Sequence, residues 1–280
     1  MTKRRALKLR QIIMNKTQKK IKNIGSSPLY IVSAVFLLIA AALAIFKFVT
    51  EPYYISESIS FLIPGMTRSF VPDWYVYYLN FSTYPFLLIA ATEVFTFIGM
   101  LCVYIFMVRK SKESCKLGFG MGFIKPMLII KTVLIFAVLL IILSLQISYI
   151  LPYFANLIDL GAEVPQYEIT VCSITLAVTV FIIITEIIFV KKVYATSKAV
   201  NRTLKKGVIM GKVSVYLIVY NFIVCILSLA LLLYTLIFDS GEFIMKAALL
   251  AFIISRLLSN FNLISMRSEM LYIKSRGYTS

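Results

Sequence analysis

The sequence predicts an all-α membrane protein: a polytopic bundle of six transmembrane helices with both termini in the cytoplasm. Two observations carry this prediction, namely six apolar stretches of bilayer-spanning length and a strong segregation of basic residues to one side of them. The composition agrees, because 60% of the residues are hydrophobic whereas roughly 45–50% is usual in soluble domains.

Each apolar stretch is long enough to cross a bilayer. The hydrocarbon core is about 30 Å thick and takes about 20 residues of helix to span. Backbone groups in lipid must bond within their own segment, so the stretches are expected to be helical, and they lack the short alternating pattern of barrel strands. The six predicted spans are Leu29–Val49, Thr83–Val108, Pro126–Leu151, Tyr167–Val190, Val213–Phe238 and Phe243–Met266.

The charges predict the orientation of these spans. The segments at residues 1–28, 109–125, 191–212 and 267–280 together carry 24 of the 29 Lys and Arg residues. The connections on the other side hold one basic residue, Arg68, and most of the acidic ones. Positive residues concentrate in cytoplasmic loops, so this positive-inside bias predicts cytoplasmic N- and C-termini. The acidic residues of the outer connections are Glu51, Glu57, Asp73, Asp159, Glu163, Glu168, Asp239 and Glu242.

The chain divides into a basic juxtamembrane tail (1–28), a transmembrane domain (29–266) and a short cytoplasmic tail (267–280). The first tail is expected to be partly helical and to lie on anionic headgroups of the cytoplasmic leaflet. The net charge of +17 comes from basic residues distributed as a signal of membrane orientation. The sequence contains no recognisable nucleic-acid-binding module. The predicted partner is therefore the lipid bilayer, and no nucleic acid is expected.

The connection between the first two spans is rich in aromatic residues, among them Trp74, Tyr75, Tyr77 and Tyr78. Tyr and Trp favour the headgroup level, where a flat apolar ring carries a polar edge to water. The favoured interpretation is an interfacial anchoring segment. A cap over a cavity, or a docking face for an outer partner, is the alternative.

No catalytic, cofactor-binding or metal-binding residue is predicted. The chain has no histidine, which removes the usual general base, imidazole ligand and His-containing triads. The cysteines at positions 102, 115, 172 and 225 form no Cys-x-x-Cys pair, so neither a zinc site nor a disulfide framework is expected. The chain is predicted not to be an enzyme.

Among the charged residues inside the predicted spans, four form candidate pairs, since burial of an unpaired charge there costs about 2.5–3.5 kcal/mol on insertion scales. Glu93 and Arg256 lie about 15 Å and about 20 Å from the same face at 1.5 Å per residue, so they are predicted to meet in the bundle core. Lys131 and Glu186 form a second candidate pair near the cytoplasmic ends of consecutive spans. The predicted hydrogen-bonding neighbours of the first pair are Thr92, Thr96, Ser259 and Asn260.

These charges have two interpretations. Either they line an ion or substrate path in which transport is coupled to protonation of Glu93, or they are structural ion pairs that determine which helices pack together. The two charges of each pair neutralise each other, which favours the structural interpretation. In the first span, the small residues Ser33, Ala34, Ala40 and Ala41 predict a helix-packing face.

Several short segments from Gly25 onward carry a family resemblance, namely Ser26–Tyr30, Ile98–Gly99, Tyr104, Arg109–Lys112, Gly118–Gly122 and Ser265–Arg267. Through them the chain resembles an uncharacterised family of six-span membrane proteins from low-GC Gram-positive bacteria, some with an N-terminal zinc ribbon that is absent here. The likeness implies a bacterial cytoplasmic membrane and brings no activity or ligand.

The leading functional hypothesis is a non-enzymatic scaffold or accessory subunit of an envelope complex, in contact with other membrane proteins. The alternative is a transport component, such as the permease subunit of an ABC exporter. In that case the inner segments Ser111–Leu117 and Tyr194–Leu204 would act as coupling elements for a cytoplasmic ATPase.

Overall fold

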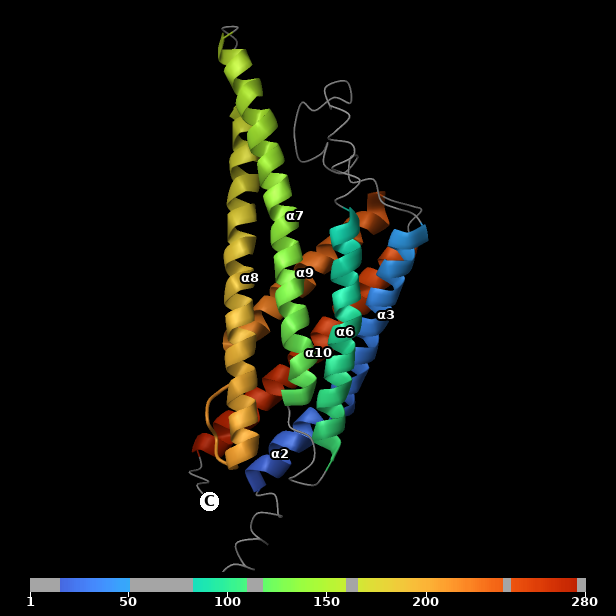
Figure 1. Ribbon diagram of the computed structural model, residues 1–280, viewed down its shortest axis with the longest axis vertical. Helices are drawn as coiled ribbons and strands as arrows, with labels where there is room; N and C mark the ends of the chain where they lie inside the picture. Colours follow the sequence, from blue (N-terminus) through green and yellow to red (C-terminus); the bar gives the residue numbers. More distant parts are fainter. Residues whose placement is uncertain (1–15, 51–82, 110–117, 160–165, 239–242, 276–280) are drawn as a thin grey trace, which may run out of the picture. The chain divides into compact units, whose positions relative to one another are not determined.

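The computed structural model describes residues 16–50, 83–109, 118–159, 166–238 and 243–275. This part of the chain is helical and contains no strand. Figure 1 labels the helices in chain order. They are α2 (Lys16–Gly25), α3 (Pro28–Thr50), α6 (Thr83–Val108), α7 (Gly118–Asp159), α8 (Gln166–Lys206), α9 (Val215–Phe238) and α10 (Phe243–Ser275).

All six stretches predicted as spans are helical, and α6 has the predicted bounds. The helices α7, α8 and α10 run longer than predicted. Helix α7 begins at Gly118 rather than at Pro126, because a helix within a membrane protein tolerates an internal proline. Helix α8 continues past the predicted end at Val190 as far as Lys206.

Five helical segments are long and apolar enough to cross a membrane, which makes the chain a membrane protein. Large apolar side chains stay exposed along them, including Ile226 (64%) and Ile237 (72%) of α9. An exposed apolar surface of this extent is compatible with lipid and not with water. The five segments are Thr17–Thr50, Leu87–Val108, Phe119–Leu140, Val215–Ile237 and Phe243–Ser275.

Local sequence signals explain two of the helix ends. Helix α3 starts at Pro28, a first position where the missing proline N–H costs nothing. Helix α8 stops at Gly207, whose φ of 69° lies in the left-handed region that glycine adopts without strain. The Gly207 N–H donates to the Thr203 carbonyl at 2.8 Å, so it satisfies one of the last carbonyls of the helix.

Packing divides the chain into two compact units. The first unit consists of residues 1–44, 91–129 and 189–280, and the second of residues 45–90 and 130–188. The long helices contribute to both. All contacts described below belong to the first unit unless stated otherwise.

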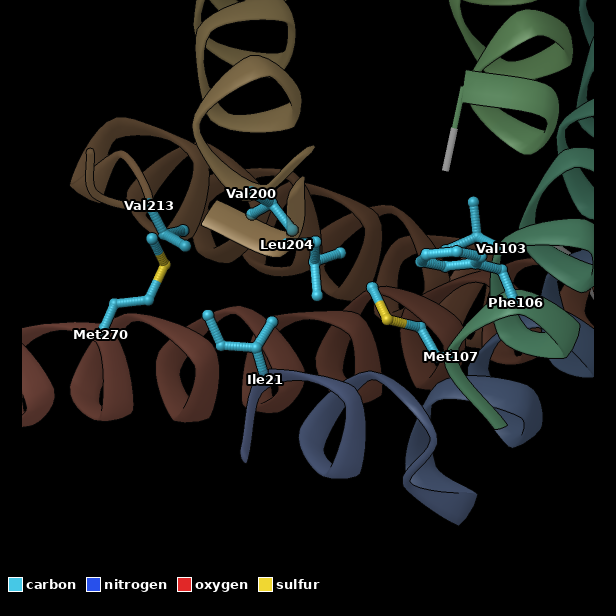
Figure 2. Close-up of a cluster of buried hydrophobic side chains, with 8 residues drawn as sticks. All are labelled: Ile21, Val103, Phe106, Met107, Val200, Leu204, Val213 and Met270. Atoms are coloured by element: carbon cyan, nitrogen blue, oxygen red, sulfur yellow. The ribbon is translucent and has the colours of Figure 1, made fainter. Parts of the chain in front are cut away.

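A cluster of buried apolar side chains forms a core of the first unit (Figure 2). It joins α2, α6, the C-terminal part of α8, the segment before α9, and α10. Figure 2 shows Met270 of α10 reaching toward Val213. The members are Ile21, Val103, Phe106, Met107, Val200, Leu204, Val213 and Met270.

Helix α2 contributes to this core, a packing role that the sequence did not predict for the basic tail. Ile21 is fully buried, and α2 packs against α10. Gln18 Nε2 donates to the Leu204 carbonyl at 2.5 Å, and Lys22 Nζ donates to the Arg109 carbonyl at 2.6 Å. The helix expected in the tail is present, but one of its faces is buried against protein.

Two glycines let α6 and α7 approach each other closely. A Cβ added at Gly120 would lie 2.6 Å from the Gly99 carbonyl oxygen and 2.8 Å from the Val103 nitrogen. A Cβ added at Gly99 would lie 2.9 Å from the Gly120 oxygen. The two backbones are therefore in contact, as small residues allow between membrane helices.

Candidate functional site

The structure brings Glu93 of α6 and Arg256 of α10 together. Arg256 Nη2 lies 3.6 Å from Glu93 Oε1, and the two side chains are 20% and 11% exposed. That distance exceeds the range of an N–H···O hydrogen bond. The contact between these two atoms is therefore a loose ion pair. The Arg256 guanidinium also lies 4.9 Å from the centre of the Phe252 ring, within the range of a cation–π contact.

Three of the four predicted polar neighbours make their hydrogen bonds elsewhere. Thr96 Oγ1 donates to the Thr92 carbonyl one turn earlier in α6 at 2.8 Å, which is the local bond that helical Thr side chains favour. Ser259 donates to the Ser33 hydroxyl at 3.2 Å. Asn260 Nδ2 donates to the Ile218 carbonyl at 3.1 Å. None of these three hydrogen bonds goes to Glu93 or Arg256, and the role of Thr96, Ser259 and Asn260 around the ion pair stays a prediction.

The hydrogen bonds of Ser259 and Asn260 join neighbouring helices. Ser33 of α3 is fully buried, and its carbonyl accepts a bond of 2.8 Å from Ser255 of α10. Ser27, just before α3, donates to Asn262 Oδ1 at 2.8 Å. The buried Ser33 and Ala34 agree with the packing face predicted for this helix.

The second predicted pair belongs to the second unit. Lys131 lies on α7 and is half-buried, and Glu186 lies on α8 with 9% of its surface exposed. Their pairing stays a prediction. The aromatic residues Trp74, Tyr75, Tyr77 and Tyr78 lie outside the described residues, as does the inner segment at 111–117.

A cavity of about 300 Å³ lies within the first unit, beside the ion pair. Residues near the α2–α3 junction and residues of α6, α7, α8, α9 and α10 form its wall. Most of the lining is apolar, and four methionines contribute to it, at positions 100, 107, 121 and 266. The wall also includes Arg256, so the cavity has a guanidinium at its edge.

Two polar atoms of this wall have no hydrogen-bond partner. They are Arg256 Nε, a donor, and Asn221 Oδ1, an acceptor. Asn221 is only 5% exposed, and both residues line the cavity. Buried polar atoms are almost always paired, so these two atoms are exceptions, and both are buried among protein atoms rather than exposed to the cavity.

The prediction from sequence missed Asn221. An amide within the apolar stretch of α9 is itself unusual in a membrane helix, and this signal could have singled the residue out. Ser197 also lines the cavity, but it follows the predicted end of its span. The sequence alone gives no reason to place Ser197 beside α10.

The charged groups of this arrangement are the Glu93 carboxylate and the Arg256 guanidinium, and they neutralise each other. Within the described residues, no group of three His, Cys, Asp or Glu side chains could hold a metal ion. No protein family, no curated protein and no solved structure matches this chain.

Proposed function

We propose that this protein is a non-enzymatic scaffold or accessory subunit of an envelope complex in a bacterial cytoplasmic membrane. It spans the membrane six times with both termini inside, and anionic headgroups contact its basic cytoplasmic face. The positive-inside charge pattern supports this orientation. The resemblance to membrane proteins of low-GC Gram-positive bacteria supports the bacterial location.

The observation that carries the proposal is the use of intramembrane polar groups for helix packing. Ser255 donates to Ser33 and Asn260 to Ile218, so each bond joins α10 to another helix. Glu93 faces Arg256 in the same way. Polar groups used in this way hold a bundle in one arrangement, which suits a protein that presents a fixed surface to partners.

Photocrosslinking in native membranes tests the proposal. A crosslinking amino acid at Ile226 or Leu227, both 64% exposed, should yield an adduct of defined mass with another membrane protein. The same partner should co-migrate with the chain in a mild detergent at fixed stoichiometry. If a scan of the exposed apolar positions yields only lipid adducts and self-adducts, the scaffold proposal is wrong.

A transport component is the second candidate, because Arg256 lines a cavity. In this case a cytoplasmic ATPase would be the partner. The predicted coupling element Tyr194–Leu204 forms part of α8, where Thr196, Val200 and Leu204 are buried. An ATPase that co-purifies stoichiometrically, and whose hydrolysis rate responds to a transported compound, would favour this candidate over the scaffold.

A further inference from the structure

We infer that the cavity beside the ion pair holds one hydrocarbon chain of a membrane lipid, whose head group stays outside. The ligand is therefore a glycerolipid that the protein recognises by its acyl chain alone. This inference goes beyond the proposed function, because assembly with protein partners requires no bound lipid. It also does not depend on which leaflet faces the cytoplasm.

The wall of the cavity is almost wholly apolar. Methionines contribute to it at positions 100, 107, 121 and 266, and their unbranched, polarisable side chains adapt to a flexible chain. Val103, Met107 and Val200 of the wall also belong to the buried cluster in Figure 2. The surface offered to a ligand is thus continuous with a hydrophobic core.

The polar residues of the wall use their polar groups within the protein. Thr196 Oγ1 accepts a hydrogen bond of 3.3 Å from the backbone of the segment before α9. Ser259 donates to a hydroxyl of α3 at 3.2 Å, and Asn262 Oδ1 accepts from the hydroxyl just before α3 at 2.8 Å. Arg256 faces Glu93. Burial of a polar group without a hydrogen bond is costly, so this wall selects a hydrocarbon.

Water is a poor occupant of such a space. A buried water molecule needs about two to four polar partners, and an apolar cavity of roughly 150 Å³ stays dry and takes up benzene. The present cavity has about twice that volume, about 300 Å³, so it accommodates a chain segment of roughly ten carbons. If it were empty, its wall atoms would lack contacts on one side, which destabilises a fold.

The lining residues extend along the helices over the depth of one leaflet. On α10 they run from Arg256 to Met266, and on α8 from Phe189 to Val200. At 1.5 Å per residue, these stretches are roughly 15–17 Å long. Half of a hydrocarbon core of about 30 Å has nearly the same depth. The cavity is only partly enclosed, so a chain can enter through its open side while the head group stays outside.

Photolabelling tests the inference with a phosphatidylcholine that carries a diazirine in the middle of one acyl chain. The full chain is placed in phosphatidylcholine nanodiscs that contain this probe, and mass spectrometry maps the adducts. Ile226 is exposed and should be labelled as an internal standard. Met107 and Leu217 are buried and line the cavity, so a chain inside it should label them. Ile21, which is fully buried and outside the lining, should stay unlabelled.

The head group gives a second comparison. The same diazirine chain on phosphatidylglycerol should label Met107 and Leu217 to the same extent, because the head group does not enter the cavity. A preference of about tenfold for phosphatidylglycerol, or roughly 1.4 kcal/mol, would overturn recognition by the chain alone. Labelling at Ile226 without labelling at Met107 and Leu217 would show that no lipid chain enters the cavity and would overturn the whole inference.

Substitutions at two neighbouring residues of α8 locate the site. Ser197 lines the cavity, so Ser197→Phe adds a ring to the wall and should largely abolish labelling of Leu217 but not of Ile226. The matched control Ala195→Phe adds the same ring at an exposed position that does not line the cavity, and it should change neither. Ser197→Ala should also leave the labelling unchanged, because a hydrocarbon needs no hydroxyl partner.

Size-exclusion profiles and circular dichroism establish that each variant is folded. Val193→Phe, a second substitution in the wall, decides the question if Ser197→Phe does not fold. If a folded wall variant is labelled at Leu217 as strongly as the unmodified chain, the lipid chain lies elsewhere and the inference fails. The scaffold proposal would survive that result, because the crosslinks to a protein partner test it separately.

Discussion

Arg256 carries two roles that a single residue in a membrane can combine. It neutralises Glu93 across a helix interface, and it contributes to the wall of a cavity. The positions of Glu93 and Arg256 along their predicted spans were sufficient to predict the first role. Both residues lie at similar depths below the same predicted face of the membrane. The second role depends on side chains from several helices, so counting along one helix cannot show it.

The hydrogen bonds of the predicted polar neighbours show what the sequence does not determine at the scale of single residues. Thr96 bonds to the carbonyl one turn earlier, which is a local choice that competes with any partner on another helix. Ser259 bonds to Ser33 because the small residues of α3 allow α10 to approach. Which of these options wins is decided by distances between helices, and the sequence does not contain those distances.

Glu93→Gln should destabilise the protein, because it leaves the Arg256 charge buried without its counterion. The expected cost is on the order of 3 kcal/mol, as for other buried pairs with one partner removed. Thermal unfolding in detergent should show a lower midpoint. Glu93→Gln/Arg256→Gln should recover most of the loss, and an unchanged midpoint for Glu93→Gln alone would show that the pair contributes nothing to stability.

Gly120→Ala should destabilise the contact between α6 and α7. The new methyl group would lie 2.6 Å from the Gly99 oxygen, so the two backbones would have to separate, at a cost of about 1–3 kcal/mol. Gly122→Ala is the matched control, because nothing lies within 4 Å of a Cβ at that position. Equal thermal midpoints for the two variants would contradict the close approach.

At the scale of elements, the helices were predictable and their ends were less so. The apolar runs predicted where α3, α6 and α9 lie to within two residues. The sequence did not predict that the polar residues after Val190 continue the same helix, α8. Its buried residues Thr196, Ala199, Val200, Thr203 and Leu204 repeat at helical spacing.

Helix α2 shows how a charged segment can also have a buried face that its sequence does not reveal. Its lysines predict a headgroup contact, and Lys19 and Lys20 are indeed exposed. The opposite face carries Thr17, Gln18 and Ile21, which are buried. The other helices of the chain are far more apolar. The short buried face of α2 is therefore only a weak sequence signal for packing against protein.

Ile21→Ala should therefore destabilise the cytoplasmic end of the bundle. Ile21 is fully buried in the core cluster, and removal of such a side chain typically costs about 2–5 kcal/mol. The thermal midpoint should fall, and a protease should cut the N-terminal segment faster. Lys19→Ala, at an exposed position of the same helix, should change neither quantity. If both variants behave alike, α2 is not packed as described.

At the scale of the whole molecule, composition and charge predicted the class. Five segments of the described chain are long and apolar enough to cross a membrane, which agrees with an all-α membrane bundle. The division into two packing units was not predictable, because the long helices α7 and α8 are continuous in sequence and contribute to both. Nothing along a continuous helix marks where its packing partners change.

The central claim is that the basic end of the molecule faces the cytoplasm. The orientation determines which side of the membrane lies nearer to the cavity, because residues near α2 and in the C-terminal halves of α8 and α10 contribute to its wall. Reversal of the topology would place the same residues at the outer surface.

Substituted-cysteine labelling in intact cells tests this claim most directly. In a variant with alanine at all four native cysteine positions, Lys205→Cys places a thiol at an exposed position of α8. The control Ser240→Cys lies in the predicted outer turn, outside the described residues. A membrane-impermeant maleimide should label Ser240→Cys in intact cells and Lys205→Cys only after permeabilisation. Labelling of Lys205→Cys in intact cells would contradict the proposed orientation.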